Sequence, residues 1–269
     1  MSTTPAAPLQ RTQVGDHQIA WRQAGPVDAP AVLLVHGLLA DQSIWDAVAD
    51  AMAGSFAVLR YDLRGHGQSS ATEPPYTMGQ LADDAVGLLD ALAISRVHLV
   101  GSSLGGMLAQ QVAARHGQRL HSLTLANTAA MQPAPAAWQA RIDLVRANKD
   151  VTPLADGTLA RWFTPGFMAS AAAQVQRVRA VLCQTSEAGY VGCASAVRDL
   201  SQGHLLPMIS VPTLVIAGAF DEATPPAQSV ELCNGIVDAR LVTLDAAHQS
   251  ALEQPEAFFT AWRTFVDGL

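Results

Sequence analysis

Six short apolar runs alternate with stretches of helical periodicity along most of this 269-residue chain, and a strand-like pair around Gly15 and Asp16 precedes them. Buried strands that are separated by helices form a largely parallel sheet, because each helix returns the chain to the edge where the next strand begins. The sequence therefore predicts an α/β fold with a mostly parallel eight-stranded sheet flanked by helices. The runs are Ala31–Val35, Phe56–Tyr61, Val97–Val100, Leu120–Ala126, Thr213–Ala217 and Arg240–Leu244, and the main helical candidates are Ser43–Ala53, Met78–Leu92, Leu104–His116 and a last helix from Pro255.

The alternation is interrupted once, between Gln132 and Pro207. This segment has no buried-strand run, and alanine, arginine, tryptophan and methionine recur in it at helical spacing between prolines. A long connection inside a compact domain is often a lid over a functional site. We therefore expect residues 1–131 and 208–269 to form one core, and residues 132–207 to form a helical insert that acts as a lid over one end of the sheet.

Charge limits the kinds of partner. Hydrophobic residues make up 49% of the chain and charged residues 14%, which indicates a globular protein with a sizeable core. Sixteen basic residues against 23 acidic ones give a formal net charge of −7, and Lys149 is the only lysine. Because no basic stripe is available to contact phosphates, the sequence disfavours a nucleic-acid or anionic-membrane partner and favours a small molecule.

The cysteines indicate neither disulfides nor a metal site. Cys183, Cys193 and Cys233 are widely spaced and form no C-x-x-C pair, and no cluster of His, Cys and Asp has the spacing of metal ligands. No apolar run reaches 18 residues, and the first ten residues lack the pattern of a secretory signal. We expect a cytoplasmic protein with no membrane segment, no metal and no cofactor, whose oligomeric state these patterns leave open.

The residues Gly101-Ser102-Ser103-Leu104-Gly105-Gly106 match the pattern G-x-S-x-G with Ser103 at its centre. The motif directly follows one apolar run and directly precedes a helical candidate, which is the setting that holds a nucleophilic serine on a tight turn. Its glycines allow the strand and the helix to approach each other closely. We predict that Ser103 is a nucleophile, and the alternative is an ordinary glycine-rich turn.

A serine hydroxyl is a weak nucleophile that needs a base, and the base needs a carboxylate to orient it. Asp221 follows the fifth apolar run and His248 follows the sixth. Both are therefore expected at the carboxyl ends of parallel strands, the edge at which Ser103 also lies. We predict Asp221 as the acid and His248 as the base, with Glu222 and Asp245 as rival acids.

Two backbone amides are expected to stabilise the oxyanion that forms when a serine attacks a carbonyl group. One belongs to Leu104, directly after the nucleophile, and the other to Leu38, in the bend that Gly37 permits after the first long apolar run. We interpret His36, in the same bend, as a structural histidine. The glycine-rich stretch 62–69 lacks the third glycine of a dinucleotide-binding fingerprint, and we interpret it as a structural turn.

Longer segments extend these patterns over about residues 15–265. They are Leu59–Gly67, Leu125–Ala130, Trp138 with Arg141, Arg161–Pro165, Glu187–Tyr190 and Asp245–His248. Together with the motifs above, they resemble the α/β-hydrolase superfamily and, within it, the 3-oxoadipate enol-lactonases. Part of the resemblance lies in the helical insert, where members of one fold superfamily usually diverge.

The resemblance implies a cofactor-independent serine hydrolase that opens a small lactone through an acyl-enzyme. It implies the order Ser, acid, His along the chain, as Ser103, Asp221 and His248 provide. Trp138 and Trp162 of the insert are then expected to be apolar walls of the substrate pocket. A carboxylated substrate would need a local cation, and Arg141 and Arg161 are the candidates.

Two other interpretations stay open. The bend His36-Gly37-Leu38-Leu39, followed by Ile44-Trp45, resembles the broader group of bacterial esterases and haloperoxidase-like hydrolases. It is compatible with a general carboxylesterase. The second alternative is a binding protein that keeps a hydrolase scaffold without turnover.

Overall fold

The computed structural model describes residues 7–269 and has an eight-stranded sheet, so the first six residues of the expected core lie outside the described part. The strand order is β1-β2-β4-β3-β5-β6-β7-β8. Strands β1 and β2 form an antiparallel hairpin, β2 is antiparallel to β4, and all later pairs are parallel. The predicted mostly parallel sheet is therefore confirmed. The strands are β1 Gln10–Val14, β2 His17–Ala24, β3 Ala31–Val35, β4 Ala57–Tyr61, β5 Val97–Ser102, β6 Leu120–Ala126, β7 Thr213–Gly218 and β8 Arg240–Leu244.

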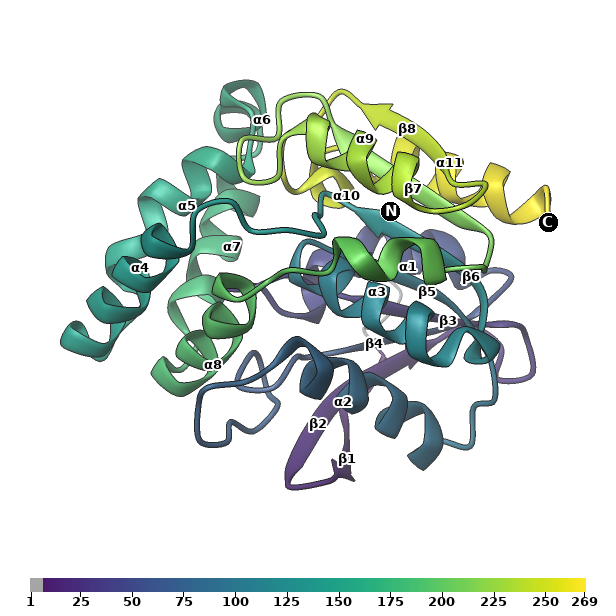
Figure 1. The fold of residues 1–269 in the computed structure, drawn as a ribbon, viewed down its shortest axis with the longest axis horizontal. Coiled ribbons are helices and arrows are strands. Elements are labelled where there is room, and N and C mark those ends of the chain that lie inside the picture. Colours follow the sequence, from purple (N-terminus) through teal and green to yellow (C-terminus); the bar gives the residue numbers. More distant parts are fainter. Residues whose placement is uncertain (1–6) are drawn as a thin grey trace.

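Helices flank this sheet, and those from the middle of the chain gather beyond one end of it (Figure 1). Helix α1 packs on α11, and α2 packs on α3. Five helices, α4 to α8, occur between β6 and β7. The α-helices are α1 Asp46–Met52, α2 Met78–Ala91, α3 Leu104–His116, α4 Pro135–Asn148, α5 Ala155–Trp162, α6 Pro165–Ser170, α7 Ala172–Cys183, α8 Glu187–Arg198, α9 Pro226–Gly235, α10 Ser250–Glu253 and α11 Pro255–Asp267.

The expected element boundaries differ from the observed ones in a few places. Strand β5 continues past Val100, because Gly101 and Ser102 still pair with β6. The helix expected from Ser43 is divided into a 3-10 turn and α1. A short helix, α10, precedes α11, and Pro255 starts the new helix because it has no N–H to continue the old one.

The helical insert is joined to the core at a narrow neck. Met131, directly before it, forms an antiparallel bridge with Ser201, six residues before its expected end at 207, and the 3-10 turn 203–208 that follows packs on α3 and α9 of the core. The amide of Gln132 donates to the Leu200 carbonyl at 3.1 Å, and the amide of Gln202 donates to the Ala130 carbonyl at 2.7 Å. Because these two segments are bonded to each other, the insert leaves and re-enters the core at one point.

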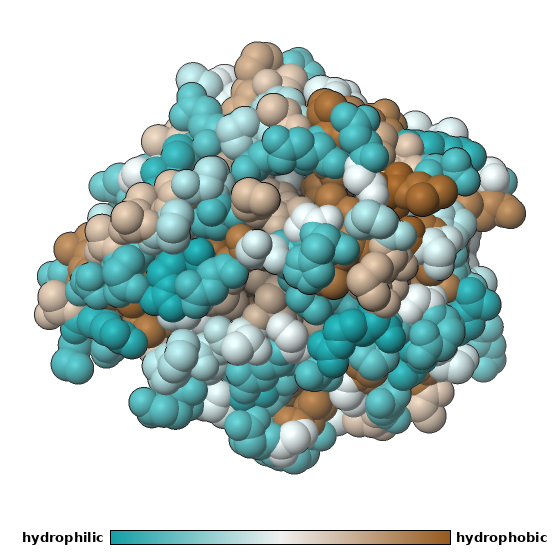
Figure 2. Space-filling view, viewed as in Figure 1, coloured by the Kyte–Doolittle hydropathy of each residue, from teal (hydrophilic) through white to brown (hydrophobic). Residues whose placement is uncertain are grey.

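Apolar packing continues from the sheet into the insert. One cluster of buried hydrophobic side chains contains the strands, α2, α3 and insert residues such as Val145, Leu182 and Tyr190. Most of the face seen in Figure 2 is hydrophilic, and apolar atoms gather mainly over α9 and β8, where Val230 and Leu241 are exposed. Among residues 7–269, no helix is long and apolar enough to cross a membrane.

Candidate active site

Ser103 lies on a strained turn between β5 and α3. Its backbone φ of 54° falls in the left-handed region, which a residue with a side chain rarely adopts. A Cβ atom on Gly101 would lie 2.3 Å from the Gly105 carbonyl oxygen, so strand and helix meet only because this position has no side chain. The turn is fixed by the Ser103 amide, which donates to the Ala126 carbonyl at 3.0 Å, and by its own carbonyl, which accepts from Thr128 Oγ1 at 2.7 Å.

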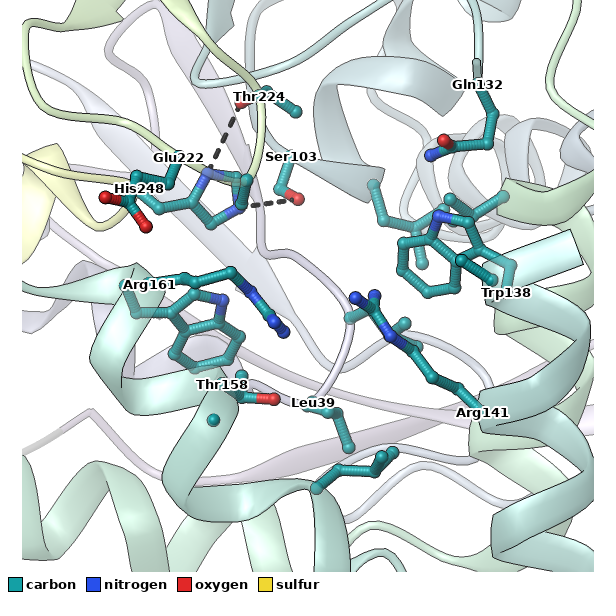
Figure 3. A pocket seen from close by; sticks show the side chains of 18 of the residues that line it. Leu39, Ser103, Gln132, Trp138, Arg141, Thr158, Arg161, Glu222, Thr224 and His248 are labelled. Carbon is teal, nitrogen blue, oxygen red and sulfur yellow. Dashed lines mark hydrogen bonds between the residues drawn. The ribbon is translucent and has the colours of Figure 1, made fainter. Parts of the chain in front are cut away.

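The side chains of Ser103, His248 and Asp221 form one hydrogen-bonded chain. His248 Nε2 is 3.0 Å from Ser103 Oγ, and His248 Nδ1 is 2.8 Å from Asp221 Oδ2 and 3.0 Å from Oδ1. Asp221 and His248 are both buried, and they lie in the loops after β7 and β8. Figure 3 shows the His248 ring turned toward Ser103 across the top of the cavity. This geometry allows the imidazole to take a proton from the hydroxyl while the carboxylate orients the ring.

Asp221 is held by more partners than the sequence predicted. Its Oδ2 accepts from Asn127 Nδ2 at 3.0 Å and from Thr224 Oγ1 at 2.8 Å, and its Oδ1 accepts from the Ala223 and Thr224 amides. Burial raises the pKa of Asp221, but His248 and the hydrogen bonds from Thr224 and Asn127 outweigh burial and lower the pKa below its usual value. The carboxylate is therefore kept ionised in a buried place.

Asn127 and Thr224 were missed by the sequence interpretation, although each had a positional signal. Asn127 directly follows β6, at the same sheet edge as Ser103, and its φ of 46° suits an asparagine. Thr224 lies three residues after Asp221, the spacing at which a carboxylate accepts from a following amide. Of the rival acids, Asp245 is exposed, and Glu222 is exposed at the cavity wall. The carboxylate that contacts His248 is that of Asp221.

The predicted oxyanion turn lies against the nucleophile. A Cβ atom on Gly37 would be only 2.9 Å from Ser103 Cβ. In residues 7–269 the Leu38 amide, which lies outside the helices and strands, has no hydrogen-bond acceptor, and the Leu104 amide opens α3, where first-turn amides have no partner within the helix. Leu39 next to them has a φ of 63°. The Leu38 and Leu104 amides are thus free in two segments that adjoin Ser103.

Two buried histidines hold this turn. The Leu39 amide donates to His66 Nε2 at 3.2 Å, and the Leu63 amide donates to His36 Nε2 at 2.9 Å. Burial lowers the pKa of each imidazole to about 4, with the charge of His36 adding to the effect on His66. Both rings are therefore neutral near pH 7, each accepting a backbone amide, which fits the structural role expected of His36. His66 had been assigned only to a structural turn, and its contact with the oxyanion turn is new.

A cavity of about 330 Å³ opens beside Ser103, between the core and the helical insert. Of the nine predicted site residues, all except Asp221 line it, and Asp221 contacts His248 instead. The buried side chain of Tyr190, which the sequence interpretation did not assign to the site, also lines the cavity. The lining includes Leu38, Ser103, Leu104 and His248 from the core and Trp138, Arg141, Arg161, Trp162 and Tyr190 from the insert.

Two guanidinium groups point toward each other into this cavity, below Ser103, Arg141 from α4 and Arg161 from α5 of the insert (Figure 3). Within residues 7–269, neither Arg141 nor Arg161 forms a salt bridge, although Arg141 stacks on the Trp138 ring with its guanidinium carbon 5.0 Å from the ring centroid. Burial, together with the positive charge of Arg141, lowers the pKa of Arg161. Burial raises the pKa of Tyr190 to about 12, against the opposing influence of the two arginines. Glu222, at the cavity wall, acts on the charge of Arg161 without forming a salt bridge, so the cavity lining among residues 7–269 has two guanidinium groups and one carboxylate.

Metal-binding clusters do not occur in the part of the chain that the structure describes. No group of three or more His, Cys, Asp or Glu side chains among residues 7–269 is arranged to hold a metal ion. Cys183, Cys193 and Cys233 are free thiols.

Comparisons with known proteins agree on the fold and find hydrolases among the similar proteins. A family model described as alpha/beta hydrolase fold matches residues 30–255. The chain is 39% identical over 234 residues to 3-oxoadipate enol-lactonase 2 of Acinetobacter baylyi, which covers 87% of each chain. Among solved structures it is similar to the enol-lactonase from Burkholderia xenovorans LB400, with a TM-score of 0.92, 37% identity and coverage of 96% of this chain and 100% of that one. A hydrolase from Pseudomonas aeruginosa gives a TM-score of 0.93 with 40% identity over 96% of this chain and 98% of the other.

Proposed function

The chain belongs to the α/β-hydrolase fold family, and from that premise we propose that it hydrolyses a small lactone carrying a carboxylate, specifically 3-oxoadipate enol-lactone, to 3-oxoadipate. Its enol-lactonase relatives support the broader assignment to the ester and lactone hydrolases. We further propose Ser103 as nucleophile, His248 as general base and Asp221 as the carboxylate that orients it.

The observation that carries the substrate proposal is the pair of unpaired guanidinium groups next to Ser103. Buried or half-buried arginines are normally paired with carboxylates, because desolvating an unpaired charge is costly. Arg141 and Arg161 instead face an open cavity in a protein whose formal net charge is −7. A substrate carboxylate supplies the missing partner, since arginine and carboxylate form paired hydrogen bonds.

The proposed reaction starts when Ser103 Oγ attacks the lactone carbonyl carbon and His248 Nε2 takes the hydroxyl proton. The Leu38 and Leu104 amides then donate to the oxyanion of the tetrahedral intermediate. When the intermediate collapses, the ring C–O bond breaks and the enol oxygen receives the proton from His248. The enol stays part of the acyl group on Ser103 and becomes a ketone, which favours ring opening. Water, deprotonated by His248, finally hydrolyses the acyl-enzyme and regenerates Ser103.

The helical insert supplies the walls in this proposal. We propose that residues 132–207 act as a lid, in which Trp138 and Trp162 form apolar sides of the pocket and limit the size of the acyl group. The cavity volume of about 330 Å³ suits a compact substrate.

The direct test compares kcat/KM of the purified protein for 3-oxoadipate enol-lactone, for a neutral five-membered lactone and for p-nitrophenyl acetate. We expect a preference of at least about tenfold for the carboxylated lactone, because one charge-assisted pair contributes about 1.5–3 kcal/mol. Turnover of neutral esters without that preference would establish a general carboxylesterase instead. Binding of the lactone without any turnover would identify a binding protein on a hydrolase scaffold.

A further inference from the structure

Two backbone segments far apart in the sequence meet beside the site: residues 162–164, at the end of α5, and residues 247–249, around His248. The amide of Gln249 donates to the Trp162 carbonyl at 3.0 Å. The Trp162 and His248 rings lie with their centroids 6.4 Å apart at an interplanar angle of 32°. The residue that follows His248 is therefore hydrogen-bonded to the helical insert, at the residue that follows Arg161.

Glu253, the last residue of α10, makes a second link between the same segments. Its Oε1 accepts the Thr164 amide at 2.5 Å, and its Oε2 accepts the Ala247 amide at 2.7 Å. Hydrogen bonds to an ionised carboxylate are stronger than those between neutral groups. One carboxylate thus joins the insert to the residue that directly precedes His248.

These contacts divide the support of His248 between two parts of the molecule. Its ring nitrogens bond to Asp221 and Ser103 of the core. The amides on either side of it, at Ala247 and Gln249, bond to acceptors attached to the insert or belonging to it. Because proton transfer is sensitive to small displacements, a shift of the His248 backbone would also displace its ring from Ser103.

We propose that Glu253 is a positioning residue that holds the His248 backbone against the helical insert, so that the insert fixes the place of the base as well as the shape of the cavity. The proposal rests on the proposed function, in which His248 is the general base. Glu253 lies outside the cavity lining formed by the described residues, so it acts through His248 and not on the substrate.

A simpler role for Glu253 is to fix only the loop 247–253, through its hydrogen bond with the Ala247 amide. Substitutions at Thr164 distinguish this local role from the proposed link to the insert, because only the link needs the Thr164 amide. The Thr164 φ of −64° and the extended Phe163 before it, with φ −128° and ψ 145°, both suit a proline at position 164. Thr164→Pro removes the N–H that Glu253 binds, whereas Thr164→Ala keeps that N–H and loses only the side-chain cap on the Phe167 amide.

The experiment measures, on the full chain, the rate at which an uncharged fluorophosphonate labels Ser103, together with kcat and KM, all expressed per titrated active site. We expect Glu253→Gln and Thr164→Pro each to lower the labelling rate and kcat about tenfold, with KM within about twofold of the parent. Thr164→Ala and Glu256→Gln should stay within about twofold. Glu256 is the matched charge control, because it is exposed at the start of the neighbouring α11.

A double-mutant cycle adds a check on the link itself. In a Glu253→Ala background, Thr164→Pro should add less than about a twofold loss, since the contact is already broken. If Thr164→Pro is labelled as fast as Thr164→Ala while Glu253→Gln is labelled slowly, Glu253 fixes only the loop 247–253 and the proposal is wrong. If Glu253→Gln is labelled at the parental rate, the proposal is also wrong. This result is sufficient to reject the proposal even if the Thr164→Pro protein does not fold.

Labelling needs no lactone, so the two proposals can fail separately. A parent protein that is labelled at Ser103 but does not open the carboxylated lactone contradicts the substrate proposal and leaves the Glu253 test intact. A parent protein that is not labelled at Ser103 contradicts both, because His248 would then not activate that hydroxyl.

Discussion

The two walls of the cavity satisfy their polar groups in different ways. On the core wall, both ring nitrogens of His248 and both carboxylate oxygens of Asp221 have partners within the protein. On the insert wall, the guanidinium groups of Arg141 and Arg161 face the cavity, and no carboxylate within residues 7–269 forms a salt bridge with either. The side chains of His248 and Asp221 on the core wall are therefore paired within the protein, although the Leu38 and Leu104 amides beside them are free, whereas the two guanidinium groups of the insert wall have no salt-bridge partner among residues 7–269. The proposed catalytic groups are therefore positioned by the fold without a ligand, whereas the proposed selectivity depends on the charge of the molecule that binds in the cavity.

Replacing the proposed nucleophile tests the core wall most severely. Ser103→Ala should lower kcat by about 10⁶ and leave stability nearly unchanged, because removing the nucleophile removes the acyl-enzyme route and deletes a single hydroxyl. Turnover assays and thermal unfolding check both parts. Ser102→Ala is the control, and a Ser103→Ala protein that keeps more than about a hundredth of the parental kcat would remove Ser103 from the mechanism.

The acid comes next. Asp221→Asn should lower kcat by about 10⁴, because the amide cannot stabilise the imidazolium and favours the wrong tautomer of His248. Asp245→Asn, at an exposed carboxylate three residues before His248, is the matched control and should cost less than about tenfold. If steady-state kinetics gave the two costs in reverse order, Asp245 would be the acid.

The insert wall should respond in a way that depends on the substrate. At least one of Arg141→Ala and Arg161→Ala should lower kcat/KM for the carboxylated lactone by about ten- to hundredfold and change the value for a neutral ester of similar size by less than about threefold. Arg146→Ala is the control, because this arginine is exposed on the same helix as Arg141. Equal losses on charged and neutral substrates would make the arginines structural and favour the general carboxylesterase.

The core wall should also be sensitive to acid through its buried histidines. Burial lowers the pKa values of His36 and His66 to about 4, below the value of about 6.5 for an unfolded chain. Between those values the unfolded chain binds more protons than the folded chain. The contribution of each neutral histidine to the free energy of unfolding is therefore fully present above about pH 6.5 and is lost as the pH is lowered toward 4. At pH 5 the loss should be about 2 kcal/mol for each histidine.

Urea unfolding at pH 7.5 and pH 5 measures this loss. His66→Gln should reduce the difference between the two pH values by about one histidine's share, whereas His204→Gln removes an exposed histidine and serves as the control. A pH difference that His66→Gln leaves unchanged would contradict a neutral, buried His66.

The smallest expected effect concerns the shape of the insert wall. Trp138→Ala should raise activity toward longer p-nitrophenyl esters relative to the acetate by a few fold, because it removes a large apolar side chain from the pocket. The same change removes the ring on which Arg141 stacks, so activity toward the carboxylated lactone should fall slightly. If the selectivity for acyl length did not change, Trp138 would contribute only to packing within the insert.

Much of the core was predictable because its signals are local. The alternation of apolar runs and helices predicted all eight strands, and helix α3 has the expected bounds. The G-x-S-x-G pattern placed Ser103 between strand and helix because glycines are required there by backbone contact. The neighbours of Asp221 were not predicted, since Asn127 reaches it across 94 residues of sequence and a single asparagine after a strand has many possible roles.

The sequence predicted that the insert is helical but not which of its side chains face the cavity. Helical spacing indicated that the segment is helical, without the bounds of any helix. Periodicity does not say which arginine faces a cavity and which faces solvent, as Arg141 and Arg146 on one helix illustrate. The Glu253 link joins residues 89 positions apart, and no pattern near Glu253 indicates its partner.

The sequence by itself indicated the strands, the helices of the core and the serine turn, because the signal of each is a pattern of residues close together in the chain. Only the tertiary structure decided that Ser103 meets His248, 145 residues later, and that two arginines face one cavity without a salt bridge among residues 7–269. Parallel strands bring their carboxyl ends to one edge whatever the length of chain between them, so residues that follow such strands can be expected to lie close together. The direction of a long side chain, in contrast, depends on how separate segments pack, and many sequences share the same local pattern with different packing.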